Sequence, residues 1–367
     1  MNKILTVAPE HVGAISPYQP GKPISELARE MGLAEADIVK LASNENPLGM
    51  SAAAREAVIA ALDEGARYPD GNGFALKSAL MEKFGVGVER IVLGNGSNDI
   101  LELAARAVLA PGHSAVFSQY GFAVYPLVTQ AIGAEGIMVP ARDFGHDLDA
   151  MAAAIRPDTR IVFIANPNNP TGTFIEGAMI EAFLQRVRED VLVVLDEAYT
   201  EYLDADQRYD SIGWTARFPN LLVSRTFSKA YGLAGLRVGY GVGHAEVIDL
   251  LNRVRQPFNV NHVALAAAQA ALRDEDYLVR SATLNRRGMT QLTDAFRRLG
   301  LEWIPSCGNF IALRVGDAAK VNAALLAQGI IVRPIAGYGM PEWLRVSIGL
   351  EAENARFIAA LERALRE

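Results

Sequence analysis

Hydrophobic residues in the central part of the chain form short runs, separated by longer stretches that mix apolar and polar residues. Each run is continuously apolar rather than alternating, which is typical of strands buried on both faces of a parallel sheet. Between about residues 75 and 255 the sequence therefore predicts an α/β fold, with a mainly parallel central sheet covered by helices. The predicted strands are Arg90–Leu93, Ala115–Ser118, Ile137–Val139, Arg160–Ala165, Val191–Leu195, Leu221–Ser224 and Val238–Val242.

The pattern changes on both sides of this region, which predicts three parts. We expect an N-terminal arm over residues 1–47, a large domain over 48–255 and a smaller α+β domain over 256–367. The arm is rich in proline and too short to fold alone, so we expect it to pack with the small domain or with a partner subunit. Further predicted helices are Ile24–Met31, Ser51–Asp63, Val263–Arg273, Tyr277–Leu299, Ala318–Gln328 (ended by Gly329) and Glu351–Arg366, and further predicted strands are Asn309–Arg314, Ile330–Val332 and Leu344–Ile348.

Composition narrows the classes of protein to consider. The chain has 367 residues and a net charge of −7, and its basic residues are scattered, so nucleic acid and anionic membranes are not expected partners. Cys307 is the only cysteine and the five histidines are widely spaced, so no metal site is expected. The N-terminus lacks the apolar core of a signal peptide, and no apolar run reaches the roughly 18 residues that span a membrane. We expect a cytoplasmic protein.

Lys229 lies in a segment that combines an amine with groups able to bind an anion. The segment Ser224–Gly239 is too apolar for an ordinary solvated loop. A lysine in such surroundings is a candidate nucleophile that forms a Schiff base. Thr226, Ser228 and Arg237 offer neutral and charged hydrogen bonds to a phosphate dianion. A Schiff-base amine beside phosphate donors is what pyridoxal 5'-phosphate requires, whereas an ordinary surface lysine is the alternative.

A glycine-rich turn offers a second anion site. Gly94–Asp99 follows a predicted strand and precedes a predicted helix, Asp99–Leu109. Backbone N–H groups at a helix start attract anions, and glycines allow a close approach. Taken alone, the pattern favours Ser97 as an N-cap and Asp99 as a first-turn acid. The turn is not a P-loop, because no Gly-Lys-Ser/Thr follows.

Polar residues also follow other predicted strands, at the sheet edge where open α/β folds bind ligands. We expect Asp196 to pair with a cationic ring nitrogen and Tyr199 to donate to a phenolate oxygen. An N-cap and a packed tyrosine are the respective alternatives. In the proline-bounded loop Asn166–Gly172, turn chemistry explains much, but Asn169 is our choice to hold a ligand oxygen. Tyr120 either stacks on a ligand ring or packs in the core, and its residue type leaves both open.

Together these motifs resemble the fold-type I pyridoxal-phosphate enzymes of the aspartate aminotransferase superfamily. Their order and spacing agree with that superfamily along nearly the whole chain. The greatest likeness is to its class II histidinol-phosphate aminotransferase family. The segments that carry this likeness are Pro17–Lys22, Leu41–Pro47, Arg67–Pro69, Lys229–Gly239 and Trp343–Gly349.

The resemblance implies a role for each candidate residue. Lys229 would bind the cofactor covalently, with Asp196 on its ring nitrogen and Tyr120 stacked on its ring. Tyr199 and Asn169 would hold the ring oxygen. The cofactor phosphate would be bound by Ser97, Asn98, Thr226, Ser228 and Arg237, and by Tyr68 of a second subunit, which implies a homodimer with shared sites.

For the substrate, the resemblance implies that Arg345 grips the acidic group and that Arg333 and Tyr18 recognise a phosphate. Asn46 is a further substrate-binding candidate. The alternative for both arginines is a surface ion pair of little energetic value. The implied reaction is a ping-pong exchange of an amino group between glutamate and imidazole-acetol phosphate, which yields histidinol phosphate in histidine biosynthesis.

Two other enzymatic activities and one non-enzymatic function are alternatives to this reaction. An aromatic amino-acid aminotransferase, acting on phenylalanine or tyrosine, would need Arg345 but not Arg333. A threonine-phosphate decarboxylase would share the phosphate pocket but release CO₂. A cofactor-sensing regulatory domain is disfavoured, because the chain is acidic and carries no DNA-binding segment.

Overall fold

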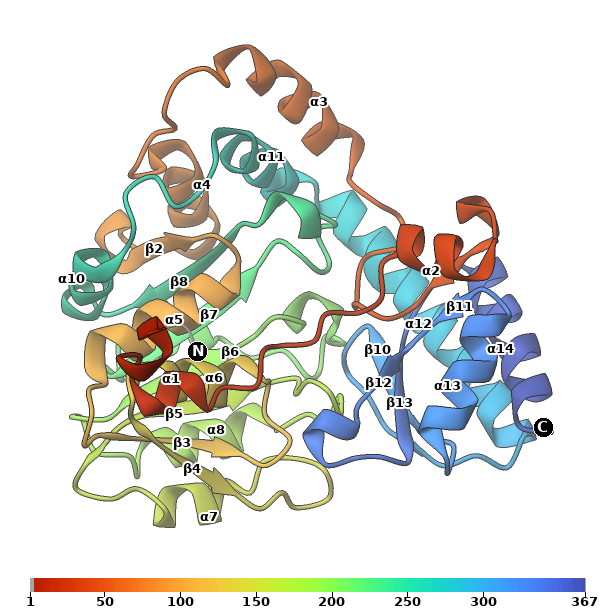
Figure 1. Cartoon of the computed structure of the whole chain (residues 1–367). Coiled ribbons are helices and arrows are strands. Elements are labelled where there is room, and N and C mark those ends of the chain that lie inside the picture. The colour runs from red at the N-terminus through yellow and green to blue at the C-terminus, as the bar shows by residue number, and fades with distance from the viewer. Residues whose placement is uncertain (1–2, 367) are drawn as a thin grey trace.

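The larger part of the fold is built around a seven-stranded sheet in the computed structural model, which describes residues 3–366 (Figure 1). Every neighbouring pair of strands is parallel except the two pairs made by β8, which runs antiparallel to both β2 and β7. The predicted α/β class with a mainly parallel sheet is confirmed. In spatial order the strands are β2 (Ile91–Gly94), β8 (Gly239–Gly243), β7 (Leu221–Thr226), β6 (Leu192–Asp196), β5 (Thr159–Ala165), β3 (Ser114–Ser118) and β4 (Glu135–Val139).

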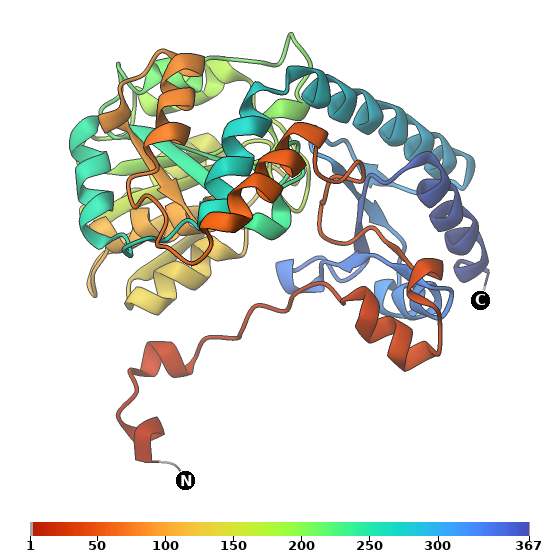
Figure 2. The same ribbon diagram turned by 90° about the horizontal axis from the view of Figure 1, so that it is seen from above.

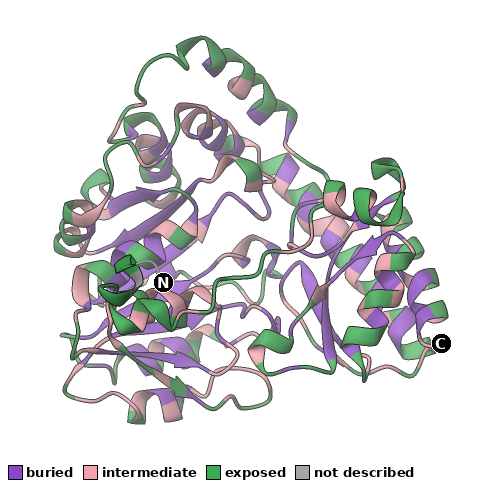
Figure 3. Ribbon diagram, in the orientation of Figure 1, coloured by how far each residue is buried: buried purple, intermediate pink, exposed green. Residues whose placement is uncertain are grey.

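Helices cover both faces of this sheet, and its central strands are buried (Figure 3). On β6, Val193 and Leu195 belong to one apolar core, while Leu192 and Val194 belong to the other. This double burial explains why the strand is apolar at every position. The helices of this unit are α3 (Ala52–Ala61), α4 (Phe74–Phe84), α5 (Ser97–Val108), α6 (Val124–Ile132), α7 (Leu148–Ala153), α8 (Gly177–Leu184), α9 (Ser211–Trp214), α10 (Ala245–Val254) and α11 (His262–Arg273).

The C-terminal part forms a smaller unit around an antiparallel four-stranded sheet. Its strands, in spatial order, are β12 (Arg333–Pro334), β13 (Trp343–Ser347), β10 (Phe310–Arg314) and β9 (Trp303–Ile304). The helices α12 (Glu275–Arg298), α13 (Ala318–Ala327) and α14 (Glu351–Ala364) pack against it through Phe296, Leu325 and Phe357. Gly329 follows α13 with a φ of +73°, as expected of a residue that ends a helix.

The predicted strand Ile330–Val332 is divided between two partners. Its first half, β11 (Ile330–Ile331), pairs in parallel with β1 (Val39–Lys40) of the N-terminal arm, and the chain then enters β12. In the same arm α2 (Ile24–Met31) buries Leu27 against Ile331. Residues 24–42 are therefore attached to the smaller unit, whereas the residues before them run outward as an extended arm (Figure 2). The arm also carries α1 (Glu10–Gly13), where the His11 carbonyl accepts a hydrogen bond from Gln130 of α6.

The predicted domain boundary at residue 255 stays a prediction. Helix α11 lies beyond that residue, yet Ala264, Ala268 and Leu272 pack into the core of the larger unit. The long helix α12 then continues into the smaller unit. Within residues 3–366, no helix is long and apolar enough to cross a membrane.

Candidate active site

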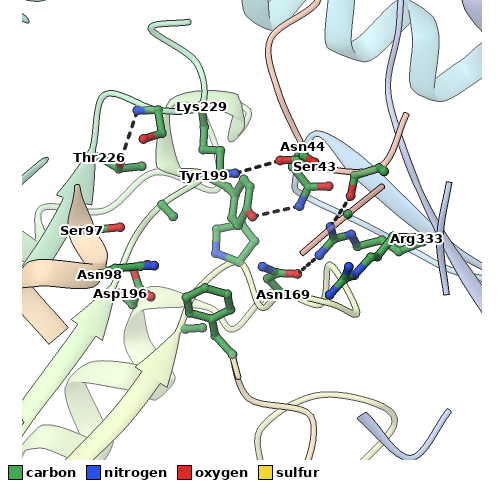
Figure 4. Close-up of a pocket in the computed structure, with 18 of the residues that line it drawn as sticks. Ser43, Asn44, Ser97, Asn98, Asn169, Asp196, Tyr199, Thr226, Lys229 and Arg333 are labelled. Atoms are coloured by element: carbon green, nitrogen blue, oxygen red, sulfur yellow. Dashed lines mark hydrogen bonds between the residues drawn. The ribbon is translucent and has the colours of Figure 1, made fainter. Parts of the chain in front are cut away.

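A pocket lies where the carboxyl ends of β5, β6 and β7 face the smaller unit (Figure 4). Residues from the N-terminal arm, the large sheet and the small sheet all contribute to its wall. We call it the central pocket; its lining includes Tyr18, Ser43, Asn44, Ser97, Asn98, Phe122, Asn169, Asp196, Tyr199, Thr226, Ser228, Lys229, Arg237, Arg333 and Arg345. Most residues predicted from separate motifs are therefore brought together by the fold.

Lys229 follows β7 and points into the central pocket (Figure 4). Its amine donates a 3.2 Å hydrogen bond to the Ser43 carbonyl and lies 5.9 Å from the centroid of the Tyr199 ring. Burial, reinforced by the nearby Arg345 and Arg237 guanidinium groups, lowers the pKa of Lys229 from 10.5 to about 8. A larger fraction of this amine is therefore neutral near pH 7 than of an exposed lysine, which favours nucleophilic attack and proton abstraction.

Asp196 is the last residue of β6 and is buried with one oxygen unsatisfied. Its Oδ2 accepts a 2.9 Å hydrogen bond from the Tyr125 hydroxyl, whereas Oδ1 has no partner among the described residues. Burial raises the pKa of Asp196 to about 6. A cation placed against Oδ1 would therefore offset the free-energy cost of burying this carboxylate without a partner. The N-cap alternative is wrong, because the next helical turn begins at Thr200 after Tyr199 and receives no side-chain cap.

Tyr199 and Asn169 line the central pocket, and each is hydrogen-bonded to a residue outside the large sheet. The Tyr199 hydroxyl accepts a 3.0 Å hydrogen bond from Asn44, and burial raises its pKa to about 12, so it keeps its proton at neutral pH. The side-chain oxygen of Asn169 accepts a 2.6 Å hydrogen bond from Arg345. Both residues are therefore held by segments far away in the sequence.

The opposite end of the pocket is built for an anion. Ser228 accepts a 3.2 Å hydrogen bond from Arg237, and Thr226 accepts one of 3.1 Å from the Ser228 N–H. Helix α5 begins here at Ser97, behind Gly96 at the cap position. A Cβ at Gly96 would lie 2.5 Å from an Arg237 nitrogen and would displace that side chain, and the φ of +83° also favours glycine.

Ser97 is therefore the first residue of α5, and its prediction as an N-cap is wrong. The glycine before it, with a φ of +83°, occupies the cap position and offers no side-chain bond. Ser97 and Asn98 instead line the central pocket beside the free N–H groups of the first helical turn. Asp99 accepts from the Asn95 N–H and from Asn259, and so supports the turn.

Two arginines lie opposite each other on the wall formed by the smaller unit. Arg333 on β12 and Arg345 on β13 are direct cross-strand partners, a position where like charges repel. Arg345 donates to the Ala42 carbonyl, and the Arg333 guanidinium lies 5.4 Å from the centroid of the Tyr18 ring. Within residues 3–366 neither arginine forms an ion pair, so the surface ion-pair alternative is wrong. The pair is suited to an anionic ligand.

Three predicted site residues lie outside the central pocket. Tyr120 packs with Phe144 at a ring distance of 6.0 Å, and the aromatic residue that lines the pocket is Phe122, two positions later. The stacking role was therefore predicted for the wrong residue. A tight turn at Gly121 leads the chain from Tyr120 to Phe122, and it is Phe122 that lines the pocket. Tyr68 is 83% exposed and stacks on Phe258.

Asn46 is also misplaced as a substrate-binding residue. Its amide donates to the Ala230 carbonyl at 2.9 Å and to Ser281 at 2.8 Å, and its oxygen accepts from the Leu48 N–H. With these bonds made, Asn46 holds the segment in place rather than facing a ligand. The preceding residues Ser43 and Asn44 line the pocket instead. The sequence motif Leu41–Pro47 indicated this segment but not these two residues. Among the described residues, no cluster of histidine, cysteine, aspartate and glutamate side chains is arranged to hold a metal ion.

Known proteins share this architecture and sequence. Residues 36–361 match the family model of class I and II aminotransferases. The chain belongs to this family. This aminotransferase is 67% identical over 362 residues to histidinol-phosphate aminotransferase 1 of Cupriavidus pinatubonensis, covering 98% of the chain and 96% of the relative. It is 64% identical over 367 residues to histidinol-phosphate aminotransferase 2 of Ralstonia nicotianae, covering 99% and 98%.

A solved structure agrees with these sequence relatives. Histidinol-phosphate aminotransferase from Sinorhizobium meliloti, in complex with pyridoxal-5'-phosphate, superposes on this aminotransferase with a TM-score of 0.89. The two are 29% identical, and the match covers 97% of this chain and 96% of the other. The family predicted from the motifs is thereby confirmed.

Proposed function

We propose that the chain is a histidinol-phosphate aminotransferase that uses pyridoxal 5'-phosphate. It exchanges an amino group between the glutamate/2-oxoglutarate pair and the imidazole-acetol phosphate/histidinol phosphate pair, in histidine biosynthesis. The observation that carries this proposal is the placement of the Arg333–Arg345 pair in the same pocket as the Lys229 amine. Relatives more than 60% identical over nearly the whole chain bear the same name.

The residues present suit the cofactor. Lys229 supplies the amine that would hold it covalently, and the unsatisfied Oδ1 of Asp196 is suited to a protonated ring nitrogen. Phe122 offers an aromatic face, and Tyr199 and Asn169 are placed for a ring oxygen. The donors for its phosphate are Ser97, Asn98, Thr226, Ser228 and Arg237. Once bound, pyridoxal phosphate accepts the electrons that remain when the substrate Cα loses a proton.

The protein's own groups then have defined tasks. Lys229 takes the proton from the substrate Cα and would deliver a proton to the C4′ carbon of the cofactor. Its lowered pKa suits it to both steps. The Asp196 carboxylate would stabilise the positive charge of the protonated ring nitrogen inside the buried pocket. Arg345 and Arg333 bind the carboxylate of glutamate or the phosphate of histidinol phosphate, since a guanidinium group suits both anions.

Arg333→Ala is expected to separate the two classes of substrate. We expect kcat/KM for histidinol phosphate to fall about 10- to 100-fold, because a charge-assisted hydrogen bond to phosphate is lost. Phenylalanine carries no phosphate, so its kcat/KM should change less than about threefold. Steady-state kinetics with both donors and 2-oxoglutarate as acceptor provide the measurement.

The matched control for this experiment is Arg314→Ala. Arg314 is an exposed arginine of the same small sheet that pairs with Glu302 and Glu342 outside the central pocket. It should alter neither substrate by more than about twofold. Equal losses for both substrates in Arg333→Ala would contradict a phosphate-binding role. Release of CO₂ from threonine phosphate, without 2-oxoglutarate-dependent amino transfer from histidinol phosphate, would favour a decarboxylase.

We also propose that the enzyme is a homodimer in which Tyr68 reaches the partner's site. Tyr68 is strongly exposed and stacks on the exposed Phe258, and the apolar side chains of Ile59, Leu62 and Phe74 in the neighbouring helices are exposed as well. Such a surface is typical of an interface. Cytoplasmic location and the docking of the N-terminal arm on a partner stay predictions from the sequence.

Mixing two impaired variants tests the shared site. Lys229→Ala and Tyr68→Ala chains, refolded together, should form hybrid dimers with one intact site, composed of Lys229 from one chain and Tyr68 from the other. We expect the mixture to regain about a quarter of wild-type activity, since random pairing makes half of the dimers hybrid. A mixture no more active than the average of its two components would contradict a shared site.

A further inference from the structure

Asn44 makes a hydrogen bond that no role assigned so far explains. Its side-chain nitrogen donates to the Tyr199 hydroxyl at 3.0 Å, and both residues are almost fully buried at the wall of the central pocket (Figure 4). Asn44 precedes Asn46 in an irregular segment of the N-terminal arm, whereas Tyr199 belongs to the large unit. The bond therefore joins two parts of the chain 155 residues apart.

The orientation of the Asn44 amide is fixed by Ser347 of β13. The Ser347 hydroxyl donates to the Asn44 side-chain oxygen at 3.0 Å and accepts from the Asn44 backbone N–H at 2.8 Å. The hydroxyl has one proton and donates to no other acceptor among the described residues, so that proton is used only when the amide oxygen faces Ser347. The amide NH₂ must then face Tyr199.

This orientation decides where the Tyr199 proton points. A phenol has one proton to donate, and here its oxygen already accepts from Asn44. The proton is therefore directed away from Asn44. Tyr199 lines the central pocket, so the remaining direction is toward a ligand in that pocket. Without Asn44, the hydroxyl would be free to rotate.

The backbone keeps Asn44 in this place. Asn44 has a φ of +55°, a conformation that asparagine adopts more readily than most residues. Its carbonyl accepts a 2.9 Å hydrogen bond from Asn309 of the smaller unit. Ser347 lies two residues after Arg345 on β13, on the same face of the strand. The strand that carries the anion-binding arginine thus also fixes the amide.

We propose that Asn44 is a positioning residue that aims the Tyr199 hydroxyl proton into the central pocket, with Ser347 setting the direction of its amide. The inference rests on the proposed function, in which Tyr199 donates a hydrogen bond to the ring oxygen of pyridoxal phosphate. It adds two residues from the arm and the small sheet to the machinery that holds the cofactor.

A double-mutant cycle tests this inference through the Kd of the apoprotein for pyridoxal phosphate. Asn44→Gly removes the amide but tolerates the positive φ, so it is preferable to alanine. We expect Asn44→Gly to raise Kd about fivefold and Tyr199→Phe about tenfold, in the range of single hydrogen bonds. The double variant should match Tyr199→Phe within about twofold, because Asn44 acts through the hydroxyl.

Ser347→Ala provides a second variant that leaves residue 44 unchanged. It should raise Kd about two- to threefold in the wild-type background and have no effect in Tyr199→Phe. Multiplicative effects in both cycles would overturn the inference while leaving the proposed function intact. If Tyr199→Phe alone binds pyridoxal phosphate as tightly as the wild type, the proposed role of Tyr199 fails, and the inference fails with it.

Discussion

Replacing Lys229 with alanine is expected to abolish amino transfer, lowering kcat/KM by at least about 10⁴-fold. Two functions are lost together: the amine that holds the cofactor and the base that moves the substrate proton. Positioned acid–base catalysis alone contributes roughly 10²–10⁴-fold. Assays with histidinol phosphate and 2-oxoglutarate measure the loss.

Two control variants separate this role from a general effect of charge. Lys229→Arg keeps a positive charge but cannot form a Schiff base at neutral pH, so it should be as inactive as alanine. Lys83→Ala removes an amine that pairs with Glu275 outside the central pocket, and its activity should stay within about twofold of wild type. Substantial activity in Lys229→Arg would contradict the covalent role.

Replacing Asp196 with asparagine is expected to lower kcat about 10²–10⁴-fold. The amide is nearly the same shape but cannot balance a buried positive charge, and leaving such a charge unpaired costs about 3–5 kcal/mol. The loss should appear in kcat rather than only in KM, because the charge matters most when electrons move into the cofactor ring.

Tyr125→Phe is the matched control for Asp196→Asn. It removes the hydrogen bond to Oδ2 but keeps the carboxylate, so kcat should fall less than about tenfold. Steady-state kinetics of both variants, loaded with saturating pyridoxal phosphate, provide the comparison. If Asp196→Asn lost no more activity than Tyr125→Phe, the charge of Asp196 would not be what the reaction needs.

The α/β fold could be predicted because burial on both faces is recorded in the sequence. Runs such as Val191–Leu195 are apolar at every position, and the structure buries alternate residues of β6 in two different cores. The reversed direction of β8 could not be predicted, since a buried strand has the same composition whichever way it runs. The pairing of β1 with β11 could not be predicted either, because each of these strands has only two residues and so shows no periodicity.

The candidate site was predictable where chemistry is tied to a strand end. Asp196 ends a buried strand, Asn169 and Lys229 each follow one, and parallel strands bring such residues to one edge. Tyr120 was misplaced because the sequence shows where a strand ends but not how the next turn rotates its side chains. The role predicted for Asn46 is wrong for a similar reason: in an irregular segment, only the backbone conformation decides which side chains face the pocket.

The central claim is that one amine, that of Lys229, holds the cofactor. Borohydride reduction of the holoenzyme makes that bond permanent, and mass spectrometry of the digested protein then locates the modified peptide. The account predicts a single pyridoxyl-modified site, at Lys229. Modification at any other lysine, or none at Lys229, would contradict it.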